Sequence, residues 1–140
     1  MVANAKTGAI LASSTYPTFD PNLRDMTNYL DYNISYAYEP GSTMKIFSYM
    51  ATMENGEYNG SEKYTSGVYK TKDGTEIGDW LRSGWGKITY DQGFALSSNV
   101  GVINLINKHL NGNLLMDYYK KLGFGSKTNI ELANEVSGKL

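Results

Sequence analysis

Residues 38–45 read Tyr38-Glu39-Pro40-Gly41-Ser42-Thr43-Met44-Lys45. The segment that follows contains the apolar residues Ile46, Phe47, Met50, Ala51 and Met53. These apolar residues recur with the spacing of one helix face. Proline is favoured at the start of a helix, and Asn55-Gly56 is typical of a helix end. The stretch therefore predicts a helix from Pro40 to about Asn55, the strongest helix signal in the first half of the chain.

Ser42 and Lys45 are three residues apart in the first turn of this predicted helix, so hydroxyl and amine project from the same face. A hydroxyl becomes a good nucleophile when a base takes its proton, and a desolvated lysine with a lowered pKa can be that base. The free amides and partial positive charge of a helix N-terminus can stabilise an oxyanion. The pattern is compatible with a serine nucleophile and a lysine base, although a Ser-x-x-Lys also occurs by chance in a chain of this length. The alternative is that Ser42 caps the helix and Lys45 is solvated.

A second polar element, Ser97-Ser98-Asn99, interrupts two helical segments. The first segment starts at the capping box of Thr89 and Gln92 and runs to about Leu96, and the second covers 100–110. A polar break between apolar turns suits a cleft, where Ser97 can pass a proton to or from Lys45 and the Asn99 amide can hold a substrate carbonyl. The alternative is that Ser98 or Asn99 caps the second helix.

The remaining segments carry weaker signals. Residues 1–16 predict a β-hairpin, residues 16–39 an irregular connection, and residues 113–122 a last helix that ends at Gly123. Short strands such as 67–70 are expected around an Asp73-Gly74 turn. No internal repeat or linker divides the chain.

Composition excludes several kinds of site. The chain has 140 residues, 13 Lys and Arg, 14 Asp and Glu, one His and no Cys. A net charge of −1 gives no reason to expect a surface that binds nucleic acid or an anionic membrane, and the lack of cysteine excludes disulfides, thiolate zinc sites and a cysteine nucleophile. A Ser-His-Asp triad would depend entirely on His109, which we expect to cap carbonyls near a helix end. No stretch of 18 apolar residues is present to span a bilayer.

Ser-x-x-Lys followed by Ser-x-Asn is part of the signature of penicillin-recognising serine enzymes. The wider sequence resembles the transpeptidase domain of class B penicillin-binding proteins, and is nearest to the division-type enzymes of Gram-positive bacteria. Residues 38–45 resemble the nucleophile segment of that family, and residues 92–101 resemble its second motif with its flanks. The resemblance extends over the whole chain through three further segments, which are residues 5–12, residues 17–22, and residues 122–125 with Glu135 and Gly138.

The resemblance implies an α+β fold, as a fragment of the serine β-lactamase/penicillin-binding transpeptidase fold, in which an antiparallel sheet accompanies an all-helical subdomain. The third motif of the family, Lys-Thr-Gly, belongs on a strand after Ser-x-Asn. Lys6-Thr7-Gly8 has that spelling but precedes Ser42 and reads as a hairpin turn, and no such triplet follows Asn99. We therefore expect residues 1–140 to be a partial transpeptidase domain, comprising the N-terminal hairpin, the nucleophile helix and the helical subdomain. Without the C-terminal sheet strands, it should expose apolar helix faces, associate, and show little or no turnover.

The function implied by the resemblance is peptidoglycan cross-linking. Ser42 would attack the penultimate D-Ala carbonyl of a stem peptide, and β-lactams would acylate the same hydroxyl. The resemblance assigns Lys45 as general base, Ser97 as proton relay and Asn99 as substrate anchor, with no metal or organic cofactor. It implies the extracytoplasmic face of the bacterial membrane as location, and a cell-division glycosyltransferase as partner of the full-length protein.

Several alternatives share these features. A D,D-carboxypeptidase, a serine β-lactamase and a receptor-type β-lactam sensor also carry the first two motifs, and the deacylation rate identifies the sensor. A non-enzymatic alternative is a peptide- or glycan-binding module, since the chain has 12 Tyr. The aromatic residues near the second motif could line a cleft, but a core or loop-packing role is expected for Trp80, Trp85, Tyr90 and Phe94.

Overall fold

The computed structural model describes residues 1–140, which form two compact units. Unit 1 combines residues 1–39 with residues 123–140, and unit 2 is the continuous segment 40–122. No helix in either unit has the length and hydropathy needed to cross a membrane.

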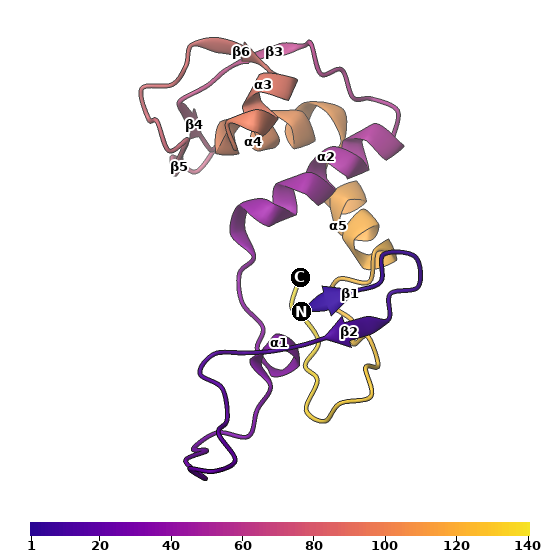
Figure 1. The fold of residues 1–140 in the computed structure, drawn as a ribbon. Helices are drawn as coiled ribbons and strands as arrows, with labels where there is room; N and C mark the ends of the chain where they lie inside the picture. Colours follow the sequence, from indigo (N-terminus) through magenta and orange to yellow (C-terminus); the bar gives the residue numbers. More distant parts are fainter. The chain divides into compact units, whose positions relative to one another are not determined.

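Unit 1 contains a short hairpin and one turn of helix (Figure 1). Strands β1 (Val2–Ala3) and β2 (Ile10–Ala12) pair antiparallel, which confirms the predicted hairpin. The Asn4 side chain accepts hydrogen bonds from the backbone amides of Lys6 and Thr7, so the Lys-Thr-Gly triplet lies in the connecting turn as expected. Helix α1 (Tyr32–Ser35) was not predicted, and it interrupts the segment expected to be irregular.

The C-terminal segment is joined to α1 within unit 1. The amide of Val136 donates to the carbonyl of Ile34 at 2.9 Å. Nearby, the Glu135 carboxylate accepts from the backbone amides of Thr128 and Asn129. Unit 1 is therefore closed by residues from both ends of the chain.

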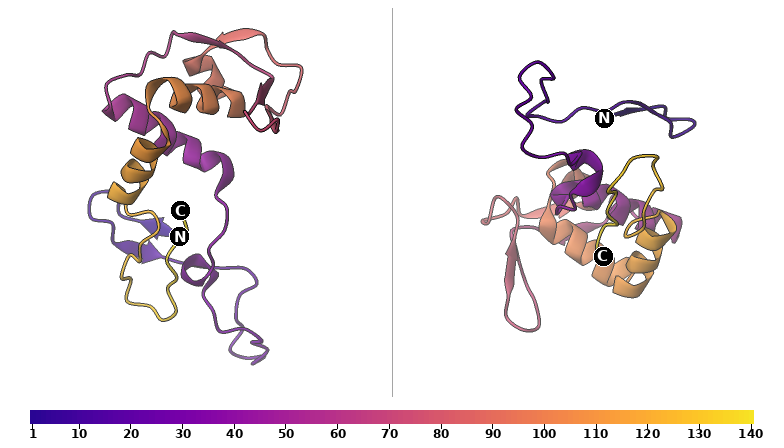
Figure 2. Two further views of the ribbon diagram at one scale, coloured as in Figure 1. Left: turned by 180° about the vertical axis from the view of Figure 1, so that it is seen from behind. Right: turned by 90° about the horizontal axis from the view of Figure 1, so that it is seen from below.

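Unit 2 begins with the helix predicted from Pro40 to Asn55. It consists of a 3-10 turn, η1 (Gly41–Thr43), followed by α2 (Met44–Glu54). The other helices are α3 (Tyr90–Ala95), α4 (Asn99–His109) and α5 (Gly112–Lys121), which confirms the three later helices with their interruption near residue 97. Helix α4 packs against α2, α3 and α5 (Figures 1 and 2).

Four short strands complete unit 2 as two antiparallel pairs. Strand β4 (Val68–Lys70) pairs with β5 (Glu76–Gly78), as expected around the Asp73-Gly74 turn. Strand β3 (Lys63–Thr65) pairs with β6 (Lys87–Thr89), which was not predicted because the two strands lie far apart in the sequence. Helices with separate antiparallel pairs confirm the α+β class.

The core of unit 2 lies between α2, α4 and the β3–β6 pair. Its buried residues are Tyr49, Tyr64, Ile88, Tyr90, Val100 and Leu105, and a second cluster joins Ala51 to Ile106 and Leu110. Of the four aromatic residues near the second motif, Tyr90 lies in this core and Trp85 packs against it. Phe94 is partly exposed on α3 and contacts Tyr49, and Trp80 makes a loop contact with Trp85.

Tyr64 occupies a space that two glycines leave open. Its ring stacks on Tyr90 at a centroid distance of 5.2 Å. A Cβ atom placed on Gly93 or Gly101 would lie 2.2 Å or 2.6 Å from the Tyr64 hydroxyl oxygen. Both glycines are helical, so their role is to admit the tyrosine and not to permit an unusual backbone.

His109 does not cap helix carbonyls as expected. Its Nε2 lies 2.7 Å from a carboxylate oxygen of Glu62, whose other oxygen accepts from the Lys108 ammonium. The ring packs edge-on against Tyr90 at 6.1 Å. The expectation was wrong because the carboxylate that meets His109 comes from a distant part of the sequence.

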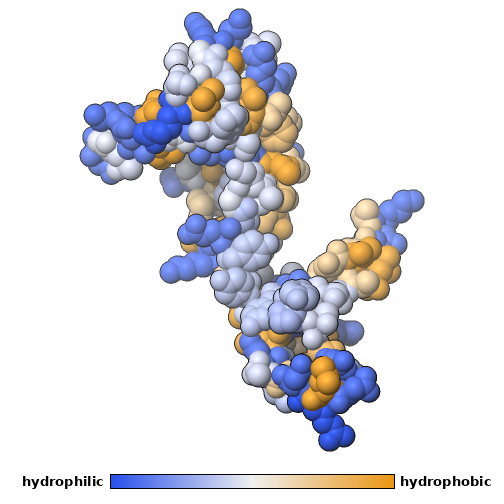
Figure 3. All heavy atoms as spheres, turned by 60° about the vertical axis from the view of Figure 1, so that its left-hand side comes forward, coloured by the Kyte–Doolittle hydropathy of each residue, from blue (hydrophilic) through white to orange (hydrophobic).

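Apolar side chains also reach the surface (Figure 3). In unit 2 one exposed stripe follows α2 with helical spacing and continues to α3; its members are Ile46, Met50, Met53 and Phe94, each 41–51% exposed. They line a hollow of about 350 Å³ together with Tyr49 and Tyr58. Unit 2 thus exposes an apolar helix face, as anticipated for a partial domain.

Candidate active site

The N-terminal end of α2 carries the predicted nucleophile and base. Gly41 has a positive φ of 62°, which starts the 3-10 turn, and the Thr43 hydroxyl donates to the Pro40 carbonyl at 2.8 Å. Ser42 is exposed, and its side chain neither caps a helix nor takes part in any hydrogen bond. The capping alternative for Ser42 is therefore wrong, and its hydroxyl is open to solvent.

Lys45 reaches from α2 to the break between α3 and α4. Its Nζ donates to the Ser97 carbonyl oxygen at 2.5 Å and to the Ser97 hydroxyl at 3.1 Å. The side chain is half-buried, so the alternative of a solvated lysine is also wrong. The structure brings Lys45 and Ser97 together, whereas no hydrogen bond joins Lys45 to Ser42.

The environment of Lys45 changes its acidity. Burial lowers the pKa of the amine from its ordinary 10.5, and the negative charge of Asp79 partly opposes this effect. The net pKa is lowered. A larger fraction of this amine is neutral near pH 7 than for a solvated lysine, as a general base requires.

The break between α3 and α4 has a left-handed residue at its centre. Ser97 has a φ of 54°, a conformation that non-glycine residues rarely adopt. The next residue, Ser98, is buried, and its hydroxyl accepts from the Gly101 amide at 2.8 Å. Ser98 therefore caps α4, as the alternative predicted, while Ser97 meets Lys45.

Asp79 is a site residue that sequence reasoning missed. It follows β5 directly and is only 3% exposed. Its Oδ1 accepts from the Ser98 hydroxyl at 2.8 Å and from the Val100 amide at 3.0 Å, and its Oδ2 accepts from the Gly67 amide at 2.9 Å. No local pattern marks Asp79, because all of these partners lie at least 12 residues away.

Asn99 is half-buried beside β5. Its amide nitrogen donates to the Gly78 carbonyl at 2.9 Å. One amide proton is thus engaged within the protein, and the second proton and the side-chain carbonyl oxygen are not. The bond to Gly78 fixes the plane of an amide that still has hydrogen-bonding capacity for a ligand.

Trp80 places an aromatic ring near the break. Its Nε1 donates to the Leu96 carbonyl at 3.3 Å, and its ring meets Trp85 edge-on at 5.4 Å. The side chain is nevertheless 73% exposed. An indole tethered next to Ser97 and open to solvent can contact a ligand bound there.

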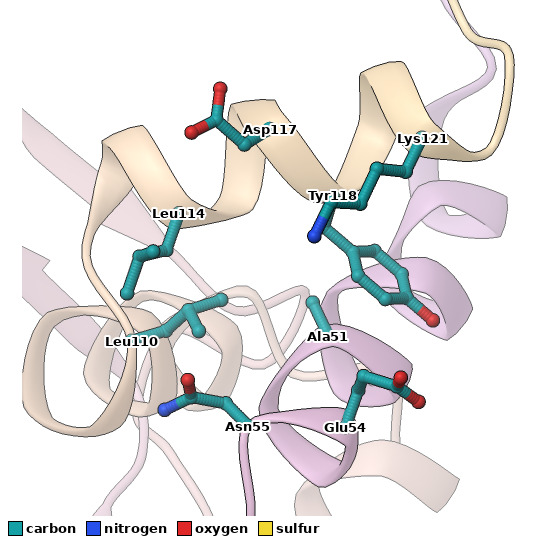
Figure 4. Close-up of a pocket in the computed structure, with 8 residues that line it drawn as sticks. All are labelled: Ala51, Glu54, Asn55, Leu110, Leu114, Asp117, Tyr118 and Lys121. Carbon is teal, nitrogen blue, oxygen red and sulfur yellow. The ribbon is translucent and has the colours of Figure 1, made fainter.

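A separate cavity of about 500 Å³ lies at the other end of α2, between α2, α4 and α5 (Figure 4). Tyr118 of α5 points toward Ala51 of α2, whereas Asp117 points away from them (Figure 4). The cavity reaches Glu54, roughly 14 Å along the helix axis from Lys45 at 1.5 Å per residue. It contains none of the predicted site residues. No group of three or more Asp, Glu or His side chains in the chain is arranged to hold a metal ion.

Comparison with known sequences gives a match over the whole chain. The family model described as "Penicillin binding protein transpeptidase domain" matches residues 1–140. Stage V sporulation protein D of Bacillus subtilis is 36% identical, over 98% of this chain and 22% of that protein. Penicillin-binding protein PbpB of Mycolicibacterium smegmatis is 33% identical, over 100% and 22%. Peptidoglycan D,D-transpeptidase FtsI of Escherichia coli K12 is 30% identical, over 99% and 23%.

Two solved structures share the fold. Pseudomonas aeruginosa PBP2, in complex with WCK 5153, has a TM-score of 0.79 at 23% identity, covering 94% of this chain and 32% of that one. A peptidoglycan glycosyltransferase from Burkholderia ambifaria has a TM-score of 0.72 at 22% identity, covering 81% and 35%. The chain therefore spans about a fifth of the length of these sequence relatives and about a third of the solved chains.

Proposed function

The chain belongs to the penicillin-binding protein transpeptidase domain family, and from that premise we propose that it contributes the nucleophile region of a class B peptidoglycan D,D-transpeptidase. The resemblance to class B proteins inferred from the sequence is confirmed by its relatives. The observation that carries the proposal is the hydrogen bond from Lys45 to the Ser97 hydroxyl, formed one helical turn from the exposed Ser42.

In the proposed reaction Ser42 is the nucleophile and Lys45 the general base. The neutral Lys45 amine takes the Ser42 proton as the serine oxygen bonds to the penultimate D-Ala carbonyl carbon of a stem peptide. Collapse of the tetrahedral intermediate breaks the peptide bond, and the terminal D-Ala leaves with a proton delivered from Lys45 through the Ser97 hydroxyl. An amine of a second stem peptide then attacks the acyl-serine carbonyl carbon; Lys45 accepts a proton from that amine and returns it to the Ser42 oxygen as the bond between that oxygen and the acyl carbon breaks. The lowered pKa of Lys45 supports this role.

Asn99 is the proposed substrate anchor. The Gly78 carbonyl accepts a hydrogen bond from one N–H of the Asn99 amide. The second N–H is left to donate to a carbonyl of the bound peptide. The exposed ring of Trp80 borders the same break and is available for apolar contact with the peptide or with a β-lactam.

We further propose that residues 1–140 are part of a larger transpeptidase domain. The exposed apolar stripe on α2 and the isolated two-stranded sheets support this, because such surfaces are normally covered. The absence of a Lys-Thr-Gly triplet after Asn99 also supports it. Loss of one oxyanion donor alone typically lowers the rate by about 10²–10³, so residues 1–140 by themselves should turn over little substrate.

The proposed ligands of the complete protein are stem peptides ending in D-Ala-D-Ala and β-lactams that mimic them. The proposed location is the extracytoplasmic face of the bacterial membrane, where these peptides are cross-linked. A cell-division glycosyltransferase is the proposed partner, and the support for it is the resemblance to division-type enzymes. Nucleic acid is not a proposed ligand at a net charge of −1.

The experiment is intact-mass spectrometry of the full-length protein after incubation with benzylpenicillin. One penicilloyl adduct is expected, which Ser42→Ala should abolish and Ser83→Ala, a change at another exposed serine, should preserve. Absence of an adduct, or an adduct that persists in Ser42→Ala, would contradict the proposal. Rapid hydrolysis of the adduct would instead indicate a β-lactamase, and D-Ala release without transfer to an amine would indicate a carboxypeptidase. A stable adduct on a protein that cross-links no peptide would indicate a sensor.

A further inference from the structure

Asp79 is a buried carboxylate with both oxygens engaged. Three donors converge on it: the Ser98 hydroxyl, the Val100 amide and the Gly67 amide. The backbone amide of Asp79 donates to the Gly67 carbonyl at 2.8 Å. Both the backbone and the side chain of Asp79 are therefore hydrogen-bonded to Gly67, the residue before β4. Burying a charged carboxylate is unfavourable unless hydrogen bonds replace the lost water, and here they do.

These bonds act on the segment that carries the candidate site. Residues 78 and 79 bond to three consecutive residues, because Gly78 accepts from Asn99 while Asp79 accepts from Ser98 and Val100. Ser98 is only 1% exposed, so its side chain is directed inward to Asp79. Its neighbours on either side are directed elsewhere, Ser97 to Lys45 and Asn99 to the edge of β5.

We propose that Asp79 is the positioning residue of this site, which anchors Ser98 and thereby fixes Ser97 and Asn99 in the orientations that they need. The inference rests on the proposed function for the roles of those two residues. Asp79 itself touches no substrate. Its effect passes through the backbone of the break.

Asp79 also acts through its charge. Its negative charge favours the protonated form of Lys45 and so opposes the effect of burial on that amine. Removing the charge should move the Lys45 titration to lower pH. A residue that only supported the fold would not shift that titration, which makes it a specific readout.

The test is Asp79→Asn in the full-length protein, with Asp117→Asn on the exposed face of α5 as matched control. We expect acylation by benzylpenicillin to slow by about tenfold or more, since the charge is lost and one acceptor oxygen is replaced by an NH2 group that cannot accept a hydrogen bond. The acid limb of the rate against pH should move to lower pH. Asp79→Glu keeps the charge, so its acid limb should stay in place while its rate falls. Asp117→Asn should change neither.

Two results would overturn the inference. One is an unchanged acylation rate and acid limb in folded Asp79→Asn. The other is a slower rate with an unmoved limb and increased amide hydrogen exchange throughout unit 2, because that combination describes general destabilisation. If Asp79→Asn does not fold, Ser98→Ala removes the anchored hydroxyl and keeps the charge. It should slow acylation without moving the limb, and normal acylation by Ser98→Ala would be decisive against the inference.

A wild-type protein that is not acylated would refute the proposed function and still leave Asp79 testable. Acetic anhydride labelling of the Lys45 amine across pH, read by peptide mass spectrometry, reports its titration without any substrate. Hydrogen exchange of peptides covering 97–100 reports the anchoring. A lower labelling midpoint and faster exchange confined to that segment in Asp79→Asn would support the positioning role, and unchanged values would reject it.

Discussion

Lys45 donates hydrogen bonds to both oxygen atoms of Ser97, the backbone carbonyl and the hydroxyl, although the two residues are 52 positions apart in the chain. Lys45 lies in the regular helix α2, whereas Ser97 is itself a left-handed residue between α3 and α4. The contact therefore depends on how α2 packs against α4. Damage to that packing should impair the site without any change at Ser42, Lys45 or Ser97.

The acylation rate should depend on pH through Lys45. Because the neutral amine is the base, the acylation rate should rise with pH as the Lys45 amine loses its proton. The midpoint of this rise should lie below the ordinary lysine pKa of 10.5. Lys45→Arg should lower the rate by about 10²–10⁴, since arginine stays protonated. The measurement is acylation by a fluorescent penicillin across pH. Lys72→Arg, at an exposed lysine, should match the wild type, and an active Lys45→Arg would remove lysine from the mechanism.

Gly93→Ala and Gly101→Ala should each destabilise the protein by about 1–3 kcal/mol, because the added methyl overlaps the Tyr64 hydroxyl. Urea unfolding measures the effect. Combining Gly101→Ala with Tyr64→Phe should cost less than the sum of the two single changes, since the clashing oxygen is gone. Gly112→Ala meets no atom within 4 Å and should be neutral or slightly stabilising. Additive costs for the double variant would contradict the overlap.

The pairing of Glu62 with Lys108 and His109 should give an acid-dependent stability. The hydrogen bond from Lys108 and then that from His109 hold the pKa of the Glu62 carboxyl below its ordinary 4.5. A carboxyl whose pKa is lower in the folded than in the unfolded protein contributes its full stabilisation at pH values above the unfolded-state pKa. That stabilisation is lost as pH falls through the folded-state pKa.

Glu62→Gln should therefore lower the melting temperature by a few degrees at pH 7, consistent with about 1 kcal/mol or less for such a pair. The difference from wild type should shrink as pH falls below 4.5 and vanish once the Glu62 carboxyl is protonated in the folded protein as well. Calorimetry across pH measures both effects. Glu57→Gln, at an exposed position, should melt like the wild type throughout. A difference that persisted in acid would show that Glu62 contributes by packing.

Thr89→Ala should lower the stability of α3 by about 1 kcal/mol, because the Thr89 side chain accepts from the Gln92 amide and Gln92 accepts from the Thr89 amide. Thr89→Ser keeps the oxygen and should lose less. Amide exchange of residues 90–95 is the measurement, and equal protection in both variants would argue against the capping box.

Local patterns predicted much of the fold and part of the site. Helix α2, the capping box of α3 and the β4–β5 hairpin follow from signals within a few neighbouring residues. The approach of Lys45 to Ser97 was expected from paired motifs, and the structure contains it. What local patterns could not provide were contacts between distant segments. The β3–β6 pair, the carboxylate of Glu62 beside His109, and Asp79 beneath Ser98 are all contacts of that kind.

The division of the chain into units has a consequence for synthesis. Unit 1 needs residues 1–39 and 123–140, including the bond from Val136 to Ile34, whereas unit 2 is continuous. Ribosomes add about 5–20 residues per second, so several seconds separate the two parts of unit 1. The segment 40–122 can fold in that interval, whereas unit 1, which includes β1 and β2, is incomplete until residues 123–140 are synthesised. Within these 140 residues, the unit whose first strand leaves the ribosome earliest is the last to be completed.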